Sequence, residues 1–214
     1  MNFNHDLVAK EIAQKLLEVK AIALSPEKPF QWSSGWNSPI YCDNRVALSF
    51  PSIRSYIKQA LADLIKNEFP EAEAIAGVAT AGIPQGALVA DLLGLPFAYV
   101  RPEPKKHGMG NQIEGFLEAN AKVVMLEDLI STGGSSLKAA KALQANGIEV
   151  VGTVAIFSYG FDVAAESFSN AGIPLKVLSN YTTLLEIASE KGYVTKEQVS
   201  VLNQWRISPD TWGK

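Results

Sequence analysis

Apolar positions along the chain switch repeatedly between two spacings, and this switching predicts alternating strands and helices. Short apolar runs bounded by turn residues predict buried strands at 74–79, 97–100, 122–127, 150–157 and 175–178. Helical spacing predicts helices at 6–20, 49–69, 83–93, 134–146, 163–171 and 182–189, and a last helix that ends near Trp205. Strands alternating with helices at this spacing predict an α/β fold, with a central parallel sheet covered by helices on both faces.

Polar residues mark several of the expected helix ends. Asp6 is expected to cap the first helix, and Ser49 the second, which carries Pro51 in its first turn. Thr195 and Gln198 form a capping-box pattern before the last helix.

Two segments lack this regular pattern. Residues 29–45 hold two extended pieces, 30–33 and 39–42, separated by turn residues, which predict a small hairpin-like flap. Residues 101–121 predict a long loop, and a long loop in a compact domain is usually functional or disordered. Proteins with a parallel sheet bind their ligands at the carboxyl ends of the strands, so the candidate binding segments are those that follow Ala79, Val100 and Glu127.

The segment 123–135 carries the strongest chemical signal. A valine-rich strand leads to two adjacent acids, Glu127 and Asp128, and then to a glycine-rich turn before a helix. Backbone N–H groups at a helix start bind phosphate, and paired acids suit two sugar hydroxyls or developing positive charge on a ribose. The turn also carries three hydroxyl side chains, those of Ser131, Thr132 and Ser135.

Two other connections carry residues suited to anions. Arg101, Lys105, Lys106 and His107 gather positive charge in one loop, where they would clamp pyrophosphate. Prolines stiffen the stem of this loop and glycines free its tip, which suits a lid. The turn after Ala79 is built of small residues, which lets backbone amides approach an anion.

Composition narrows the class of protein. The 214 residues carry a net charge of −3, and a pI near 5.5 argues against nucleic-acid binding. No apolar run reaches the roughly 20 residues of a membrane helix, and the N-terminus has no signal-peptide pattern. Cys42 is the only cysteine, which fits a reducing cytoplasm. We therefore expect a cytoplasmic protein without nucleic-acid or membrane partners.

These motifs together resemble the type I phosphoribosyltransferases. The segment 123–135 is similar to their motif for phosphoribosyl pyrophosphate (PRPP). Two further segments resemble the orotate-using members of this family. In the loop, the matching residues are Arg101, Lys105, His107, Gly108 and Gly115, and the flap corresponds to the family's hood. The resemblance implies one domain over 1–214, with an N-terminal helix and hood in 1–45 and a core in 46–214.

The resemblance also implies an activity. The expected reaction transfers the 5-phosphoribosyl group of PRPP to orotate, giving orotidine 5′-phosphate and pyrophosphate, in de novo UMP synthesis. Mg²⁺ would be the cofactor, held through substrate oxygens and water with no direct ligand from the protein. The partner would be a second copy, in a homodimer whose 101–115 loop reaches the neighbouring active site.

Residue roles follow from the same match. The catalytic residues would be Lys105, His107 and Asp128. The PRPP-binding residues would be Arg101, Lys105, His107, Glu127, Asp128, Leu129, Ile130, Ser131, Thr132, Gly133, Gly134, Ser135, Thr80 and Ala81. Orotate would contact Ser131 and Tyr41. The turn after Ala79 resembles the family's pyrophosphate loop, where a cis peptide is often found.

The chain departs from the family pattern at two positions, Ser33 and Pro102, where some members carry Lys, and Lys106 is an extra base without an assigned role. Two alternatives remain open. A phosphoribosyltransferase for another base would keep the acidic motif but not the flap and loop patterns. A PRPP-sensing regulator would need a nucleic-acid surface, which the acidic pI and the lack of a helix-turn-helix pattern disfavour.

Overall fold

The computed structural model describes residues 3–32, 35–103 and 112–213, and its centre is a six-stranded sheet in the order β10-β9-β8-β5-β6-β7. The strands are β5 (Ala74–Val78), β6 (Phe97–Val100), β7 (Ile113–Glu114), β8 (Lys122–Ile130), β9 (Glu149–Ser158) and β10 (Leu175–Asn180). All neighbours pair in parallel except β7, which runs antiparallel to β6. The predicted fold class is confirmed, and β7 corrects the reading of 101–121 as loop, since two residues are too few to show a period.

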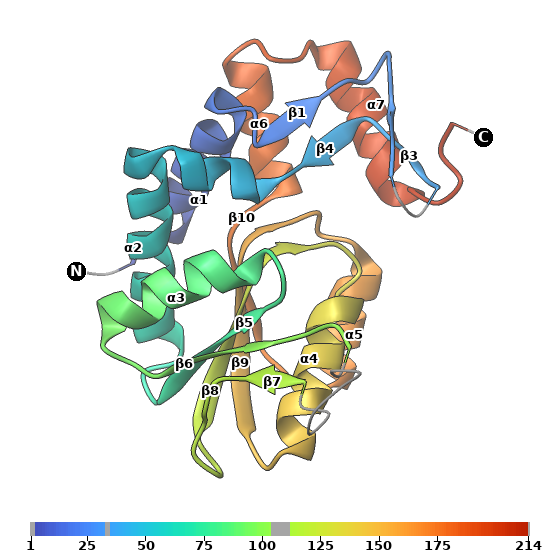
Figure 1. Cartoon of the computed structure of the whole chain (residues 1–214). Helices are drawn as coiled ribbons and strands as arrows, with labels where there is room; N and C mark the ends of the chain where they lie inside the picture. Colours follow the sequence, from blue (N-terminus) through green and yellow to red (C-terminus); the bar gives the residue numbers. More distant parts are fainter. Residues whose placement is uncertain (1–2, 33–34, 104–111, 214) are drawn as a thin grey trace.

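The helices cover both faces of this sheet (Figure 1). They are α1 (His5–Glu18), α2 (Pro51–Glu68), α3 (Gly82–Leu93), α4 (Gly134–Ala145), α5 (Asp162–Asn170), α6 (Tyr181–Glu190) and α7 (Lys196–Ile207). On β8, Val124 and Leu126 belong to the core shared with α1, α2 and α6, whereas Val123 and Met125 belong to the core under α4 and α5. Successive strand residues point to opposite faces, so a continuous apolar run serves both cores.

Two predicted helix caps are wrong and one is confirmed. Asn4, not Asp6, caps α1, because its side chain accepts a hydrogen bond from the backbone N–H of Leu7. Ser49 does not cap α2, since it ends a short 3-10 helix, η1 (Asn44–Ser49). The capping box of Thr195 is present at α7. In the described ranges, no helix is both long and apolar enough to cross a bilayer.

The N-terminal flap forms two small ladders instead of one hairpin. β2 (Phe30–Gln31) pairs with β3 (Asn37–Ser38), and β4 (Ile40–Cys42) pairs with β1 (Ile22–Leu24). Between β3 and β4, the Ser38 hydroxyl contacts both backbone groups of Ile40 and makes a tight turn there. The predicted hairpin-like flap is thus present as β2 and β3, but the extended piece at 39–42 pairs with β1 instead of with 30–33. We call residues 29–45 the hood, which Figure 1 shows near α6 and α7 at one end of the sheet.

Candidate active site

A pocket of about 250 Å³ lies where two connections, β5 to α3 and β8 to α4, meet at the carboxyl ends of β5 and β8. Its walls are Ala79, Thr80, Ala81, Glu127, Asp128, Leu129 and the turn from Ser131 to Ser136. The acidic pair, the hydroxyl-rich turn and the turn after Ala79 are thus brought together as the sequence predicts. One detail differs: β8 pairs with β9 as far as Ile130, so the two acids lie within the strand and not beyond its end.

The acidic pair is largely removed from water. Glu127 is 6% exposed; Ser136 Oγ donates to its Oε2 at 3.3 Å and the Asp128 N–H to its Oε1 at 3.0 Å. Burial raises the pKa of Glu127 to about 9, and the adjacent charge of Asp128 adds to the effect. Burial also raises the pKa of Asp128, against the opposing effects of a hydrogen bond with Glu127 and the charge of Arg45. The pair therefore retains a proton at neutral pH.

We expect Glu127→Gln to become more stable than the wild type as the pH rises. Because the folded pKa of about 9 lies above the ordinary value of 4.5, the stability that the protonated carboxyl contributes is complete below about pH 4.5 and is lost towards pH 9. The neutral amide has no such dependence. The melting temperatures should be similar near pH 5, and the variant should be higher by at least roughly 3 °C near pH 8.5. Parallel curves over this range would show that Glu127 ionises normally.

The turn between β8 and α4 presents backbone N–H groups to the pocket. Gly133 precedes α4 with φ +83°, a conformation that favours glycine, and a Cβ there would lie 3.0 Å from the Phe168 ring. α4 begins at Gly134, so Ser135 and Ser136 stand in its first turn, where N–H groups lack helical acceptors. This arrangement favours a bound phosphate.

The turn between β5 and α3 approaches the same pocket from the neighbouring strand. The peptide bond between Ala79 and Thr80 is cis, as the resemblance implied. At Gly82, the first residue of α3, a Cβ would lie within 2.4 Å of the Leu126 carbonyl oxygen on β8. Only glycine lets α3 start so close to β8, and this approach sets the place of Thr80 beside the acids.

Gly82→Ala is therefore expected to destabilise the fold by about 1–3 kcal/mol, because backbone must move to relieve the overlap. Chemical denaturation monitored by far-UV circular dichroism would measure the loss. Gly134→Ala is the matched control at the start of α4, where the nearest atom to an added Cβ is 3.9 Å away. Equal stability of both variants would contradict the close approach.

Arg101 lies in a second hollow that adjoins the first. This hollow of about 110 Å³ shares Ala79 and Ser135 with the first pocket and adds Arg101 and Lys138. Arg101 Nη1 pairs with Glu114 Oε1 on β7 at 3.3 Å. β7 thus fixes the return of the loop beside its departure from β6. The loop residues Lys105, Lys106, His107 and Gly108 lie outside the described residues.

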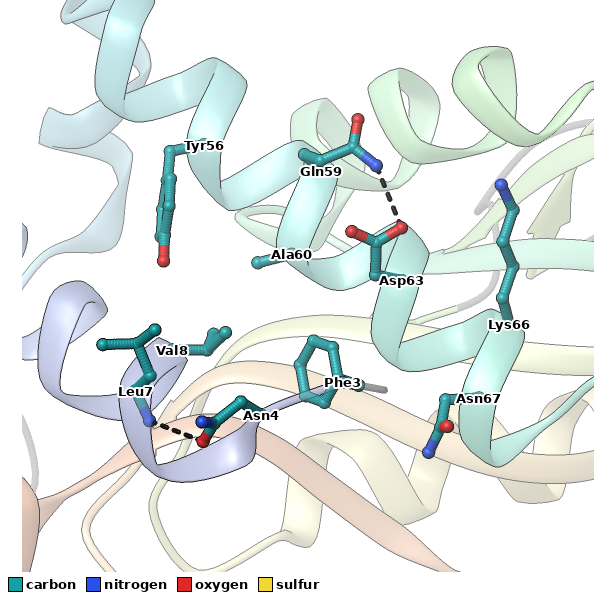
Figure 2. A pocket seen from close by; sticks show the side chains of 10 residues that line it. All are labelled: Phe3, Asn4, Leu7, Val8, Tyr56, Gln59, Ala60, Asp63, Lys66 and Asn67. Atoms are coloured by element: carbon teal, nitrogen blue, oxygen red, sulfur yellow. Dashed lines mark hydrogen bonds between the residues drawn. The ribbon is translucent and has the colours of Figure 1, made fainter. Parts of the chain in front are cut away.

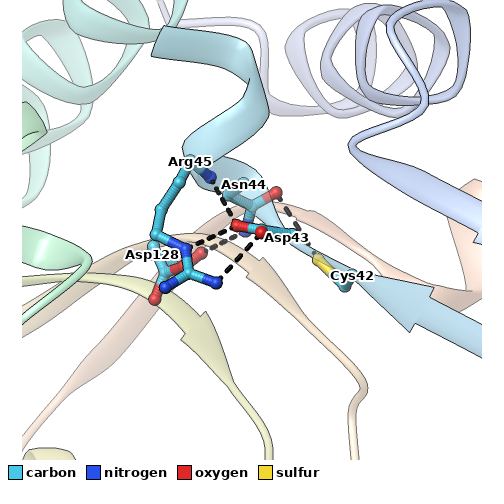
Figure 3. A network of polar contacts seen from close by, with 5 residues as sticks. All are labelled: Cys42, Asp43, Asn44, Arg45 and Asp128. Atoms are coloured by element: carbon cyan, nitrogen blue, oxygen red, sulfur yellow. Dashed lines mark hydrogen bonds and ion pairs between the residues drawn. The ribbon is translucent and has the colours of Figure 1, made fainter.

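The hood reaches the acidic pair through its last residues. Asn44 Nδ2 donates to the backbone oxygen of Asp128 at 2.7 Å, and Figure 3 shows this contact with its neighbours. Tyr41 does not line the pocket; its ring is exposed and lies 5.7 Å from that of Phe30. Ser33 lies outside the described residues. The sequence reading missed the contacts of Asn44, Ser136 and Glu114, because nothing in the pattern distinguishes them from ordinary polar residues.

A larger hollow of about 680 Å³ separates α1 from α2 (Figure 2). Leu7, Val8 and Tyr56 give it an apolar wall, and Gln59 and Asp63 hydrogen-bond to each other on its other side. The predicted site residues lie elsewhere. The buried acids therefore locate the active site in the smaller pocket, although the hollow between α1 and α2 has the larger volume. Among the described residues, no group of three or more His, Cys, Asp or Glu side chains is placed to hold a metal ion.

Comparisons with known proteins agree with this site. A family model for the phosphoribosyl transferase domain matches residues 48–173. The chain is 56% identical over 205 residues to an orotate phosphoribosyltransferase of Cytophaga hutchinsonii, covering 96% of this chain and 98% of that protein. It is 57% identical over 206 residues to one of Porphyromonas gingivalis, with the same coverage of 96% and 98%. The crystal structure of orotate phosphoribosyltransferase from Aeropyrum pernix superposes with a TM-score of 0.75 at 31% identity, over 86% of this chain and 99% of that one.

Proposed function

The chain belongs to the orotate phosphoribosyltransferases, and from this premise we propose how its residues divide the reaction between them. The enzyme transfers the 5-phosphoribosyl group of PRPP to orotate, giving orotidine 5′-phosphate and pyrophosphate, in pyrimidine biosynthesis. The observation that carries the division of roles is the pocket in which Glu127 and Asp128 face a helix start and the Thr80 turn.

PRPP is proposed to lie across this pocket. The turn from Ser131 to Ser135 would hold the 5-phosphate on backbone N–H groups and hydroxyls. Glu127 and Asp128 would accept hydrogen bonds from the ribose hydroxyls. The Thr80 turn and Arg101 would hold the pyrophosphate, since the hollow of Arg101 shares Ala79 and Ser135 with the main pocket.

Charge develops in opposite senses as the ribose–pyrophosphate bond lengthens. The sugar becomes cationic, and the Asp128 carboxylate stabilises it at short range. The leaving pyrophosphate gains negative charge, which Arg101, Lys105 and His107 would stabilise where it forms. Orotate then bonds to C1 of the ribose from the opposite face. It is already anionic and needs little help from a general base.

Mg²⁺ is proposed as the cofactor. The ion commonly binds one or two carboxylates together with substrate phosphates and several waters. Because the ion usually keeps several of its waters, PRPP oxygens and water would be its direct ligands at this pocket, and Glu127 and Asp128 would accept hydrogen bonds from those waters. When bound, the ion neutralises part of the pyrophosphate charge.

Loss of orotate absorbance on mixing enzyme, PRPP and Mg²⁺ tests these proposals together. Orotate consumption should require both PRPP and Mg²⁺, and chelation of the metal should abolish it. Adenine, hypoxanthine, guanine and uracil serve as alternative acceptors. Turnover of another base alone would overturn the hood assignment, and PRPP binding without any turnover would favour a regulator.

A homodimer is proposed in which the 101–115 loop completes the neighbouring active site. Mixing chains that carry Asp128→Asn with chains that carry Lys105→Ala tests this exchange. Random re-association makes half of the dimers mixed, and each mixed dimer has one intact site, so about one quarter of wild-type activity should return. Activity that stays at the level of the separate variants would place the loop in its own subunit's site.

We also propose a cytoplasmic location. The single cysteine, Cys42, supports it, because a reducing compartment does not favour disulfides. Cell fractionation followed by an activity assay checks this, and activity confined to a secreted or membrane fraction would contradict it.

A further inference from the structure

Arg45 stands at the inner end of the hood, beside Asp128. Its guanidinium is held edge-on by Asp43, with Nε donating to Oδ1 at 2.6 Å and Nη2 to Oδ2 at 2.9 Å. The Asp43 carboxylate also accepts the Arg45 backbone N–H at 3.1 Å, which caps η1. Two bonds to one carboxylate fix the plane of the guanidinium, and the N–H groups of Nη1 face away from that bond pair.

Asn44 fixes this pair relative to the active site. It is 2% exposed and its side-chain amide donates to the Asp128 backbone oxygen at 2.7 Å. The segment 43–45 is therefore fastened to the strand that carries the acids (Figure 3). The Arg45 side chain itself is 58% exposed, so Asp43 and the strand do not cover it and a ligand can reach it.

The chemistry of orotate favours a cation at this place. The nucleophilic N1 of the pyrimidine is bonded to C6, and C6 bears the carboxylate. When N1 meets C1 of the ribose, the carboxylate must lie close to the groups that hold the ribose, which include the buried acids. An anion there would be repelled unless a positive charge compensates it.

The other described cations near the pocket have different positions or partners. Arg101, which pairs with Glu114, and Lys138 lie in the hollow on the side of the Thr80 turn, where pyrophosphate is proposed to bind. Arg206, on α7, donates to Thr182 Oγ1 at 2.7 Å. Arg45 is the described cation of the hood whose charge acts on Asp128, and Asn44 beside it makes the hydrogen bond to the Asp128 backbone.

We propose that Arg45 binds the carboxylate of orotate, and that Asp43 is a positioning residue which orients its guanidinium. The inference rests on the proposed division of roles at the pocket. It makes Arg45 a residue that selects orotate over pyrimidines without a carboxylate.

Calorimetric binding of two nucleotides tests this selection: orotidine 5′-phosphate, which carries the carboxylate, and uridine 5′-phosphate, which lacks it. Arg45→Gln should raise the Kd of orotidine 5′-phosphate on the order of 10- to 100-fold, as expected for losing a charge-assisted bond. The Kd values of uridine 5′-phosphate and PRPP should stay within about twofold. Lys66→Gln, which removes the same charge from the exposed end of α2, should leave all three Kd values unchanged.

Three results would overturn the proposal. Equal weakening of both nucleotides would indicate a general structural role, and weakening of PRPP alone would assign Arg45 to pyrophosphate. Unchanged binding of orotidine 5′-phosphate would remove Arg45 from the site. The wild type provides the separate check on function: equal affinity for both nucleotides would overturn the orotate assignment itself, whatever Arg45 does.

A second variant, Asp43→Asn, keeps the Arg45 cation but removes the carboxylate that orients it. Asp43→Asn retains a side-chain acceptor for η1 but loses the charged partner of Arg45. In Asp43→Asn, the preference for orotidine 5′-phosphate over uridine 5′-phosphate should fall by less than in Arg45→Gln. Arg45→Lys, which keeps the positive charge, should retain more of this preference than Arg45→Gln does. Full preference in Asp43→Asn would show that Asp43 does not position Arg45. Thermal unfolding of each variant shows that the fold is intact.

Discussion

Asp128→Asn is expected to lower turnover with orotate on the order of 10²- to 10³-fold, the range for losing one preorganised charge in a buried site. The amide has the shape of the carboxylate, and the Asp128 backbone oxygen that accepts from Asn44 is untouched. What disappears is the negative charge beside the ribose when its C1 becomes cationic. Since this charge matters mainly in the transition state, kcat should fall much more than the Kd of PRPP rises.

Steady-state kinetics and PRPP binding measured on the same preparation separate these two effects. Asp91→Asn is the control, because Asp91 is an exposed acid on α3. The melting temperature of Asp128→Asn should be no lower than that of the wild type, since burial already opposes ionisation of Asp128. If Asp128→Asn retained turnover within about threefold of wild type, the carboxylate would not act in the transition state.

The order of strands and helices was predictable because each apolar run in this sheet serves two cores. Val123 to Leu126 are apolar throughout, which is the pattern of a strand buried on both faces. β7 was not predictable in the same way, because its pairing depends on where the chain returns to β6 and not on a period of its own.

The hood shows a second limit of local patterns. Its extended pieces were recognised, but their partners were not, because β4 pairs with β1, a strand that lies before the first extended piece of the predicted hairpin. The caps failed for a related reason. Asn4 and Asp6 both suit a helix start, and the hydrogen bond to Leu7 decides between them.

The chemistry of the site was predictable where neighbouring residues carry it together. Glu127, Asp128 and the turn that follows form one continuous signal. Asn44 and Ser136 act on these acids from other elements, and Asn44 is 84 positions away in sequence from the residue it holds. Only the fold brings Asn44 and Ser136 to the acids. Because Asn44 fastens the segment 43–45 beside Asp128, the position of Arg45 could likewise be found only from the structure.

The second large effect is expected for Lys105→Ala. Arg101 and Ile113 fix the two ends of the loop at β6 and β7, beside the hollow that adjoins the acids. Lys105 itself lies outside the described residues, and the prediction rests on its charge and on its match to the family's loop. Removing a cation that meets the leaving pyrophosphate should lower kcat on the order of 10²- to 10³-fold.

Lys106→Ala provides the matched control, because it removes the same charge from the next position of the same loop. If general electrostatic attraction to PRPP were the whole effect, both variants would lose similar affinity, and the loss would shrink with added salt. If Lys105 instead meets charge that forms only as the bond breaks, kcat falls in Lys105→Ala alone, and single-turnover rates fall with it. Turnover within about twofold of wild type with PRPP still bound would show that the loop does not act on the leaving group.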